Sequence, residues 1–423
     1  MSIAVSHDEN VAADVKVGVT PSERPVPRIS IHVFHEHPDL ASAVERASSD
    51  RRLSKAHLSV NEGGVASAVE FYKNNTTPNL LVVETASQGK SVLAELESLA
   101  EICDENTKVL VIGQANDVQL YRELIRRGVS EYLVAPIEPV QLIETISGLY
   151  VDPNAPPIGR VVTFISARGG AGASTLAHNI GWYVAEKLKV DTAILDLDLP
   201  YGTAGLDFNQ DPGQGIADAL SAPERLDDVL LERLLIKCGE HLSLFTAPAM
   251  IDQVYEAKCS AVETVIDQVR SSTPCVVVDL PHAWTDWARQ TLFAADEIVL
   301  VATPDLTSLR NAKNIVDIVG GHRPNDAPPK LIINQAGIPK RPEISVKEFS
   351  SALNIEPSFV IPFEPHLFGT AANNGQMLVE VQPKSKVSEG VRTLAELLTG
   401  RSVQQAPKKN GMSLLPFLAQ KAS

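Results

Sequence analysis

The sequence predicts an α/β protein with two doubly wound parallel sheets, one in each half of the chain. Two observations support this fold class. Short apolar strands alternate with helical patterns over residues 29–150 and again over residues 160–400. This alternation is typical of βα units, whose parallel sheets are covered by helices on both faces. Residues 151–159 contain three prolines and are predicted to be the linker between the two halves.

Composition narrows the class of protein. A length of 423 residues suffices for two or three domains with their own cores. A net charge of −15 disfavours a dominant surface for nucleic-acid phosphates, so we expect no specific nucleic-acid partner. The N-terminus lacks the pattern of a signal peptide, and no apolar run reaches the ~18 residues of a membrane span. Scattered cysteines indicate a reducing compartment: Cys103, Cys238, Cys259 and Cys275. We therefore expect a cytoplasmic protein, at most peripheral on a membrane.

The first half begins with a polar segment, residues 1–28, that we predict to be a disordered leader. Four strands are predicted after it, at residues 29–34, 80–84, 109–113 and 131–134. Helical patterns between them cover residues 93–102 and 118–127. The rhythm indicates a domain over residues 29–150.

The second half has seven predicted strands, at residues 161–166, 192–196, 242–246, 275–279, 297–302, 330–334 and 359–362. They are followed by loops that carry polar residues. Ligands of open α/β sheets bind at the carboxyl ends of the strands, so these loops are the candidate site. We expect this domain to span residues 160–400 and residues 401–423 to form a flexible tail.

A glycine-rich loop follows the first strand of the second half and precedes an amphipathic helix. Glycines let successive N–H groups point inward as an anion-binding nest, and the helix N-terminus adds partial positive charge. Ser174 stands where a hydroxyl can coordinate Mg²⁺. We predict a phosphate site built from Arg168, Gly169, Gly170, Ala171, Gly172, Ala173, Ser174 and Thr175.

This loop departs from the strict pattern GxxxxGK[ST] at two positions. Ala167 replaces the first glycine, and Ala173 replaces the lysine. That lysine normally stabilises charge on the β- and γ-phosphates in the transition state. Its loss removes several kcal/mol of transition-state stabilisation, while the backbone cradle and metal ligand remain. We therefore expect ATP and Mg²⁺ to bind and hydrolysis to be weak or absent.

Acidic residues follow two later strands. Asp196 and Asp198 are two residues apart, which in a strand places both side chains on one face. We predict that both carboxylates act on the metal and the attacking water. Asp279 ends an apolar run typical of a Walker B strand and is expected to hold Mg²⁺ through water. The predicted metal ligands are Ser174, Asp196 and Asp279.

The order of these motifs resembles the MinD/ParA family of deviant phosphate-loop ATPases over residues 160–400. Arg168 stands where the family has a signature lysine that contacts the partner's nucleotide in the ATP-bound dimer. The resemblance therefore implies a homodimer with Arg168 acting in trans through its bidentate guanidinium. Asn334 stands at the family's adenine-recognising asparagine, and Pro362 lies in a segment similar to its closing motif beside the base.

The first half resembles a response-regulator receiver domain whose chemistry is lost. A working receiver needs an acidic pair, a phosphoacceptor Asp, a Thr or Ser, and a Lys before a Pro. The corresponding positions here hold His35, Glu36, Glu84, Gly113 and Ala135. We interpret the domain as a receiver fold without phosphotransfer that serves as an interaction or targeting module.

A degenerate receiver joined to a MinD/ParA-like domain is similar to the CpaE/TadZ family of the tight-adherence (Flp type IVb) pilus system. The resemblance implies a localisation factor at the cell pole or inner membrane that recruits the secretion ATPase and other assembly proteins. Two alternatives remain at this stage. One is an active ParA/MinD-type ATPase that positions cargo on DNA or membrane, and the other is a phosphorylation-controlled regulator. Ala173 and the net charge disfavour the first, and Glu84 and Ala135 disfavour the second.

Overall fold

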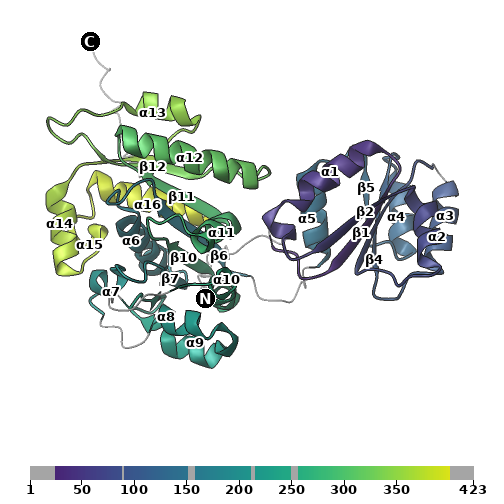
Figure 1. Ribbon diagram of the computed structural model, residues 1–423, viewed down its shortest axis with the longest axis horizontal. Coiled ribbons are helices and arrows are strands. Elements are labelled where there is room, and N and C mark those ends of the chain that lie inside the picture. Colours follow the sequence, from purple (N-terminus) through teal and green to yellow (C-terminus); the bar gives the residue numbers. More distant parts are fainter. Residues whose placement is uncertain (1–23, 88–89, 151–157, 211–214, 249–255, 401–423) are drawn as a thin grey trace, which may run out of the picture.

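The computed structural model describes residues 24–87, 90–150, 158–210, 215–248 and 256–400, which form two α/β domains (Figure 1). We call residues 24–150 the N-terminal domain and residues 158–400 the C-terminal domain. The predicted leader is too long by at least three residues, because Val26 is buried and its N–H donates to the Arg52 carbonyl. Most of the predicted leader, most of the linker and the whole tail lie outside the described residues.

The N-terminal domain contains a five-stranded parallel sheet in the order β2-β1-β3-β4-β5. Its strands are β1 (Ser30–His35), β2 (His57–Glu62), β3 (Leu80–Glu84), β4 (Lys108–Gly113) and β5 (Glu131–Val134). Its helices are α1 (Pro38–Ser48), the 3-10 turn η2 (Arg51–Leu53), α2 (Gly64–Tyr72), α3 (Lys90–Ala100), α4 (Val118–Arg126) and α5 (Pro139–Leu149). This strand order is that of the flavodoxin-like fold, to which receiver domains belong.

Alternation along the central strands divides the core of this domain into two layers. Ile31 and Val33 face α1 and α5, whereas Phe34 and Val83 face α2, α3 and α4. The sequence prediction missed β2, which lies at the sheet edge and has no fully buried residue. An edge strand that is half exposed lacks the continuous apolar run by which the other strands were recognised.

The C-terminal domain contains an eight-stranded sheet in the order β13-β12-β11-β6-β10-β7-β9-β8. Its strands are β6 (Arg160–Ser166), β7 (Thr192–Asp196), β8 (Ile236–Lys237), β9 (Leu242–Phe245), β10 (Cys275–Asp279), β11 (Glu297–Ala302), β12 (Lys330–Ala336) and β13 (Phe359–Pro362). Its helices are α6 (Ala173–Glu186), α7 (Ala204–Asp207), α8 (Ile216–Ser221), η3 (Pro223–Arg225), α9 (Asp228–Leu234), α10 (Cys259–Ser272), α11 (Asp286–Ala294), α12 (Leu306–His322), α13 (Val346–Leu353), α14 (Pro365–Asn374), α15 (Leu378–Val381) and α16 (Lys386–Thr399).

The centre of this sheet is β6, which pairs with β10 on one side and β11 on the other. Val162 and Phe164 pack toward α6 and α16, and Val161 and Ile165 pack toward α10, α11 and α12. The chain runs first to one side of β6 and later to the other, so the strand order reverses here. Open α/β sheets bind ligands at such a reversal, outside the carboxyl ends of the strands. The short β8, which the sequence did not predict, is antiparallel to β9.

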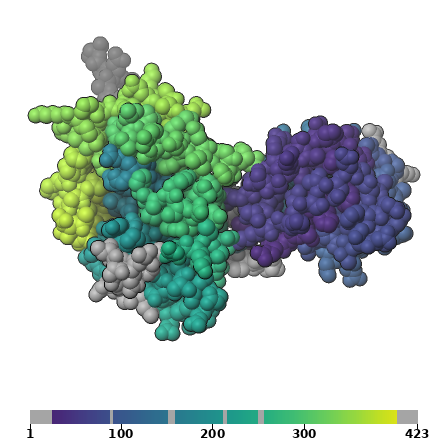
Figure 2. Space-filling view, in the orientation of Figure 1, coloured from purple at the N-terminus to yellow at the C-terminus, as the bar shows by residue number. Residues whose placement is uncertain are grey.

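The two domains form separate lobes that meet along one side (Figure 2). Helices α1 and α5 lie on the side of the N-terminal domain nearest the C-terminal domain, and α2, α3 and α4 lie on the far side (Figure 1). Within the part of the chain that the structure describes, no helix is long and apolar enough to cross a membrane.

Candidate nucleotide site

The glycine-rich loop connects the carboxyl end of β6 to the start of α6, as predicted. Gly170 and Gly172 have φ angles of 77° and 100°, which side chains of L-residues rarely tolerate. A Cβ atom at residue 172 would also lie 2.5 Å from Nδ2 of Asn334. Glycine is therefore required at residue 172 both by backbone conformation and by the close approach of β12.

Backbone N–H groups in this loop are available to a ligand. Those of Gly169, Gly170 and Gly172 make no hydrogen bond to any described residue. Three loop carbonyls, in contrast, accept bonds from side chains of neighbouring segments. The donors are Nδ2 of Asn311 to Ala167 at 2.9 Å, Nε2 of Gln335 to Gly170 at 2.9 Å, and Nδ2 of Asn334 to Ala171 at 2.8 Å. The oxygens are thus turned toward the protein, and free N–H groups remain for an anion.

Two buried carboxylates lie side by side at the ends of adjacent strands. Asp196 ends β7 and Asp279 ends β10, and the two residues are paired in the register of these strands. The carboxylate of Asp196 accepts the N–H groups of Asp198 and Ala204, each at 3.1 Å. Burial is the main cause that raises the pKa of Asp279 to about 7, and the charge of Asp196 adds to it. A bound cation would reduce the repulsion between these two carboxylates.

The strand spacing predicted for Asp196 and Asp198 is wrong. The strand β7 ends at Asp196, and Asp198 lies in the turn that follows. The carbonyl of Asp198 accepts the N–H groups of Tyr201 and Gly202, which closes that turn. Asp198 is half-buried, and burial raises the pKa of its carboxyl. Its charge also raises the pKa values of Asp196 and Asp279, so the turn keeps the third acid near the other two.

His178, which the sequence did not indicate as a site residue, lies on α6 and is completely buried. Its Nδ1 lies 2.6 Å from Oδ2 of Asp207, and its Nε2 lies 3.7 Å from Oδ2 of Asp279. Burial alone would lower the pKa of His178, but the bond to Asp207 and the charges of Asp279 and Asp196 raise it instead. In its protonated form the imidazole places positive charge next to the buried carboxylates. A lone histidine in an apolar helix gave no signal of this role.

These residues fit a Mg²⁺–nucleotide. Oδ1 of Asp279 and Nε2 of His178 are buried and have no hydrogen-bond partner among the described residues. The hydroxyl of Ser174 lowers the pKa of Asp279, so it lies near that carboxylate and the predicted metal position. Carboxylate and hydroxyl oxygens are the ligands that Mg²⁺ prefers, usually together with waters. The structure brings together the three predicted metal ligands, Ser174, Asp196 and Asp279, at the start of α6.

Arg168 points to its own chain in this structure. Its Nη1 lies 3.2 Å from Oδ2 of Asp305, and its side chain is 47% exposed. Asp305 also caps α12 by accepting the N–H of Ser308. Burial alone would raise the pKa of Asp305, but the bonds from Thr303 and Ser308 and the charge of Arg168 lower it. An exposed pair of this kind is weak, so Arg168 is free to exchange it for a phosphate.

The predicted base-binding residues lie toward the carboxyl ends of β12 and β13, at the same end of the sheet as the phosphate loop. Asn334 is buried on β12, and both ends of its amide are bonded, Nδ2 to the Ala171 carbonyl and Oδ1 to the Gln335 N–H. The Asn334 side chain thus holds the phosphate loop in place. To recognise adenine, it would have to exchange these two hydrogen bonds for bonds to the base. Pro362 ends β13 opposite Ala336, the last residue of β12. The sequence analysis missed the second brace, Gln335.

Glu84, at the predicted phosphoacceptor position of the N-terminal domain, is already bonded to residues of its own domain. Oε2 of Glu84 accepts the N–H groups of Glu36 and His37, at 2.7 and 2.9 Å, and Oε1 lies 2.9 Å from Nδ1 of His37. Glu84 is 4% exposed. At Gly113, a Cβ would lie 2.5 Å from the hydroxyl of Tyr132, so an aromatic side chain fills the space beside that position. The carboxylate of Glu84 therefore holds the β1–α1 loop in place through these hydrogen bonds.

No family model matches the chain. A solved structure of a pilus assembly protein CpaE from Caulobacter crescentus is 49% identical; the match covers 98% of that chain and 30% of this one, with a TM-score of 0.30. Sequence identity at that level extends over nearly the whole of the solved chain. The chain belongs to the CpaE family.

The CpaE-family chain is also similar to MinD/ParA proteins. A ParA family ATPase from Chlorobium tepidum is 25% identical, and the match covers 56% of the CpaE-family chain and 98% of that structure, with a TM-score of 0.51. The septum site-determining protein MinD of Buchnera aphidicola is 25% identical over 251 residues, which are 56% of this chain and 91% of that protein. The predicted α/β fold class with a MinD/ParA-like domain is confirmed.

Proposed function

We propose that this chain is an ATP-binding localisation and assembly factor of the tight-adherence (Flp type IVb) pilus system, with weak or absent hydrolysis. It acts as a dimeric scaffold whose dimerisation depends on nucleotide. The membership in the CpaE family supports a role in pilus assembly. The likeness to a ParA family ATPase supports nucleotide as the ligand of the C-terminal domain.

The single observation that carries this proposal is a complete phosphate cradle without its lysine. Free N–H groups, a hydroxyl and two buried carboxylates surround the start of α6, yet residue 173 is a buried alanine. Backbone N–H groups hold phosphate equally in the ground state and the transition state, whereas the lysine acts mainly on charge that develops in the transition state. Such a site retains binding and loses turnover.

Dimerisation through the nucleotide is supported by Arg168. Its side chain is 47% exposed, and among the described residues its guanidinium is bound by the ion pair to Asp305 alone. In a dimer, the nucleotide bound by the second copy would bring a phosphate to Arg168. A guanidinium binds phosphate in a bidentate manner. Arg168→Ala should abolish ATP-dependent dimerisation. A variant that binds ATP as tightly as the wild type and still forms the dimer would exclude the trans contact.

Calorimetric titration of ATP and ADP with Mg²⁺, together with measurement of oligomeric mass, tests the whole proposal. Trp284 lines a pocket with Ser166 and Ala167 beside the loop, so its fluorescence offers a second binding signal. ATP binding that yields a dimer with negligible phosphate release supports the proposal. Absence of binding would leave a scaffold independent of nucleotide, and brisk turnover would contradict the inference from Ala173.

Restoring the lysine provides the matching gain of function. Ala173→Lys should raise phosphate release at least about tenfold, because the transition-state contact is worth several kcal/mol when it is present. Ala66→Lys adds the same charge at an exposed position of α2 in the other domain and should change nothing. If Ala173→Lys binds ATP but releases phosphate no faster, then the missing lysine is not what limits hydrolysis.

We further propose that the N-terminal domain recruits the pilus secretion ATPase and other assembly proteins, at the cell pole or the cytoplasmic face of the inner membrane. The internal bonds of Glu84 support a binding role for this domain over a phosphotransfer role. Fluorescence microscopy of the tagged chain, with and without the N-terminal domain, tests the location. A separate fusion of residues 400–423 to a fluorescent protein tests whether the tail alone binds membrane.

A further inference from the structure

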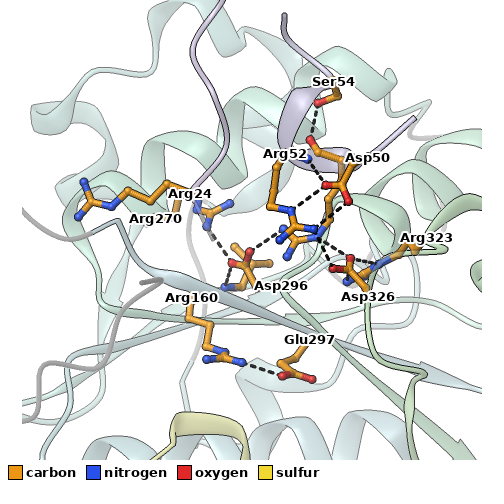
Figure 3. Close-up of polar contacts among 12 residues, drawn as sticks. Arg24, Asp50, Arg52, Ser54, Arg160, Arg270, Asp296, Glu297, Arg323 and Asp326 are labelled. Carbon is orange, nitrogen blue, oxygen red and sulfur yellow. Dashed lines mark hydrogen bonds and ion pairs between the residues drawn. The ribbon is translucent and has the colours of Figure 1, made fainter. Parts of the chain in front are cut away.

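The two domains meet through a cluster of charged side chains that the sequence did not predict (Figure 3). Arg51, from the turn η2 of the N-terminal domain, contacts two aspartates of the C-terminal domain. Its Nη1 lies 2.8 Å from Oδ1 of Asp296, and its Nε lies 3.0 Å from Oδ2 of Asp326. The three side chains keep only 12%, 5% and 14% of their surface exposed. The contact is therefore largely shielded from water and from salt.

The two aspartates are held in place by arginines of their own domain. Nη2 of Arg270 lies 2.8 Å from Oδ2 of Asp296, and Nη2 of Arg323 lies 2.7 Å from Oδ2 of Asp326. Each carboxylate thus contacts an arginine of its own domain as well as Arg51, and Oδ1 of Asp326 also lies 3.8 Å from Nη2 of Arg52. Without Arg51, one oxygen of Asp296 loses the charged donor that faces it. A fixed pair of acids of this kind is a receptor for a guanidinium, which offers several donors in a rigid plane.

Two flanking contacts extend the interface. Nδ2 of Asn325 donates to Oδ2 of Asp50 at 3.1 Å, and Asp50 itself binds Arg52 with both oxygens. On the other side, Nζ of Lys55 lies 2.5 Å from Oδ2 of Asp267. Lys55 and Asp267 are substantially exposed, so this pair contributes to orientation more than to affinity. Figure 3 shows Asp50 and Arg52 next to Arg323 and Asp326.

The cluster lies at the amino ends of the strands of the C-terminal sheet, whereas the nucleotide site lies at their carboxyl ends. Oδ2 of Asp296 accepts the N–H of Val161, which is at the start of β6. The phosphate loop follows the other end of the same strand, after Ser166. A nucleotide or a second copy of the chain at the phosphate loop therefore does not compete with the N-terminal domain for this surface.

We propose that the turn of residues 50–55 docks on the acidic surface of Asp267, Asp296 and Asp326 and holds the N-terminal domain there in both nucleotide states. Arg51 is the central residue of this docking. In a dimer formed through the phosphate loops, the two N-terminal domains then lie at the outer ends of the assembly. This inference holds for the isolated chain and does not depend on the proposed role in pilus assembly.

Zero-length cross-linking tests the docking in the full chain. A carbodiimide joins an amine to a carboxylate only when they touch, so Lys55 and Asp267 should yield a cross-linked peptide that mass spectrometry identifies. Arg51→Ala should lower that yield at least about tenfold, the change expected from one lost charge-assisted contact. Arg46→Ala removes an arginine of α1 whose Nε bonds within its own helix, and it should leave the yield unchanged.

Three outcomes decide the proposal. A yield from Arg51→Ala within twofold of the wild type, with normal circular dichroism, would overturn it. Should Arg51→Ala fail to fold, Asp326→Asn, which keeps the shape of the side chain, replaces it and should also lower the yield several-fold. Saturating Mg²⁺ and ATP should leave the yield of the wild type unchanged, and a large loss of cross-link on nucleotide binding would contradict docking in both states.

Discussion

His178 allows a quantitative test of the metal-site geometry. His178→Ala removes a fully buried imidazole that lies 2.6 Å from Asp207 and 3.7 Å from Asp279. Removal of one partner from a buried charge pair destabilises a protein by about 3–5 kcal/mol. The side chain of Asp207 is 23% exposed, so water can replace one of the lost contacts. We therefore expect a loss in the free energy of unfolding near the lower bound, about 3 kcal/mol.

Mg²⁺ and ATP should reduce this loss. Without His178, the buried carboxylates of Asp196 and Asp279 face each other with no cation between them. A bound Mg²⁺ supplies that charge, and a ligand that binds only the folded state stabilises it in proportion to its affinity. If the metal takes over the role of the imidazolium, the difference between His178→Ala and the wild type should fall by at least about half when Mg²⁺ and ATP are saturating.

Urea unfolding followed by tryptophan fluorescence measures this difference in the correct domain, because Trp182, Trp284 and Trp287 are the three tryptophans of the chain and all lie in the C-terminal domain. His366→Ala, which removes an exposed imidazole from α14, serves as the control and should change stability by less than about 0.5 kcal/mol. A His178→Ala variant as stable as the control, or a stability difference that Mg²⁺ and ATP leave unchanged, would refute a charge-compensating role for His178.

Three further predictions concern other parts of the structure. Gly172→Ala should lower ATP affinity at least about tenfold in calorimetry, because a Cβ at a φ of 100° would lie 2.5 Å from Asn334. Acetyl phosphate should leave no label on Glu84 that mass spectrometry detects, because this carboxylate is buried and already bonded. Burial alone would raise the pKa of Asp50, but the bonds from Arg52 lower it. The stability that Asp50 contributes is thus present above its unfolded pKa of about 3.9 and is lost as pH falls through the lower folded value. Hydrogen exchange at the Arg52 amide should consequently be faster in Asp50→Asn than in the wild type at pH 6, and the two should converge only when the pH falls below the lowered pKa of Asp50.

The sequence predicted the central strands well because each is a continuous run of apolar residues. The runs that end at Glu84, Asp196 and Asp279 are buried at every position, which is the pattern of a parallel sheet covered on both faces. Strands at the sheet edges, β2 and β8, carry exposed residues and gave no such signal. The loops that follow the central strands therefore located the candidate nucleotide site.

Contacts between distant parts of the chain could not be predicted in the same way. His178 and Asp279 are separated by about a hundred residues, and nothing in an apolar helix indicates which acid a histidine will meet. Arg51 lies 245 residues from Asp296, in another domain. Asp198 shows a third limit. Its predicted side-chain direction assumed a strand, but β7 ends two residues earlier, at Asp196. Periodicity predicts faces within an element, whereas pairing across the fold depends on the tertiary structure.

The side-chain bonds to the phosphate loop have a consequence for affinity. Asn311, Asn334 and Gln335 fix three carbonyls of the loop before any ligand is present. Fixing the backbone of a flexible loop on binding would consume about 1–2 kcal/mol for each residue ordered, and a preorganised loop avoids that loss. The entropy saved in this way compensates for part of the attraction that disappeared with the lysine. A loop held rigid by its neighbours therefore needs little reordering when an anion binds to its free N–H groups.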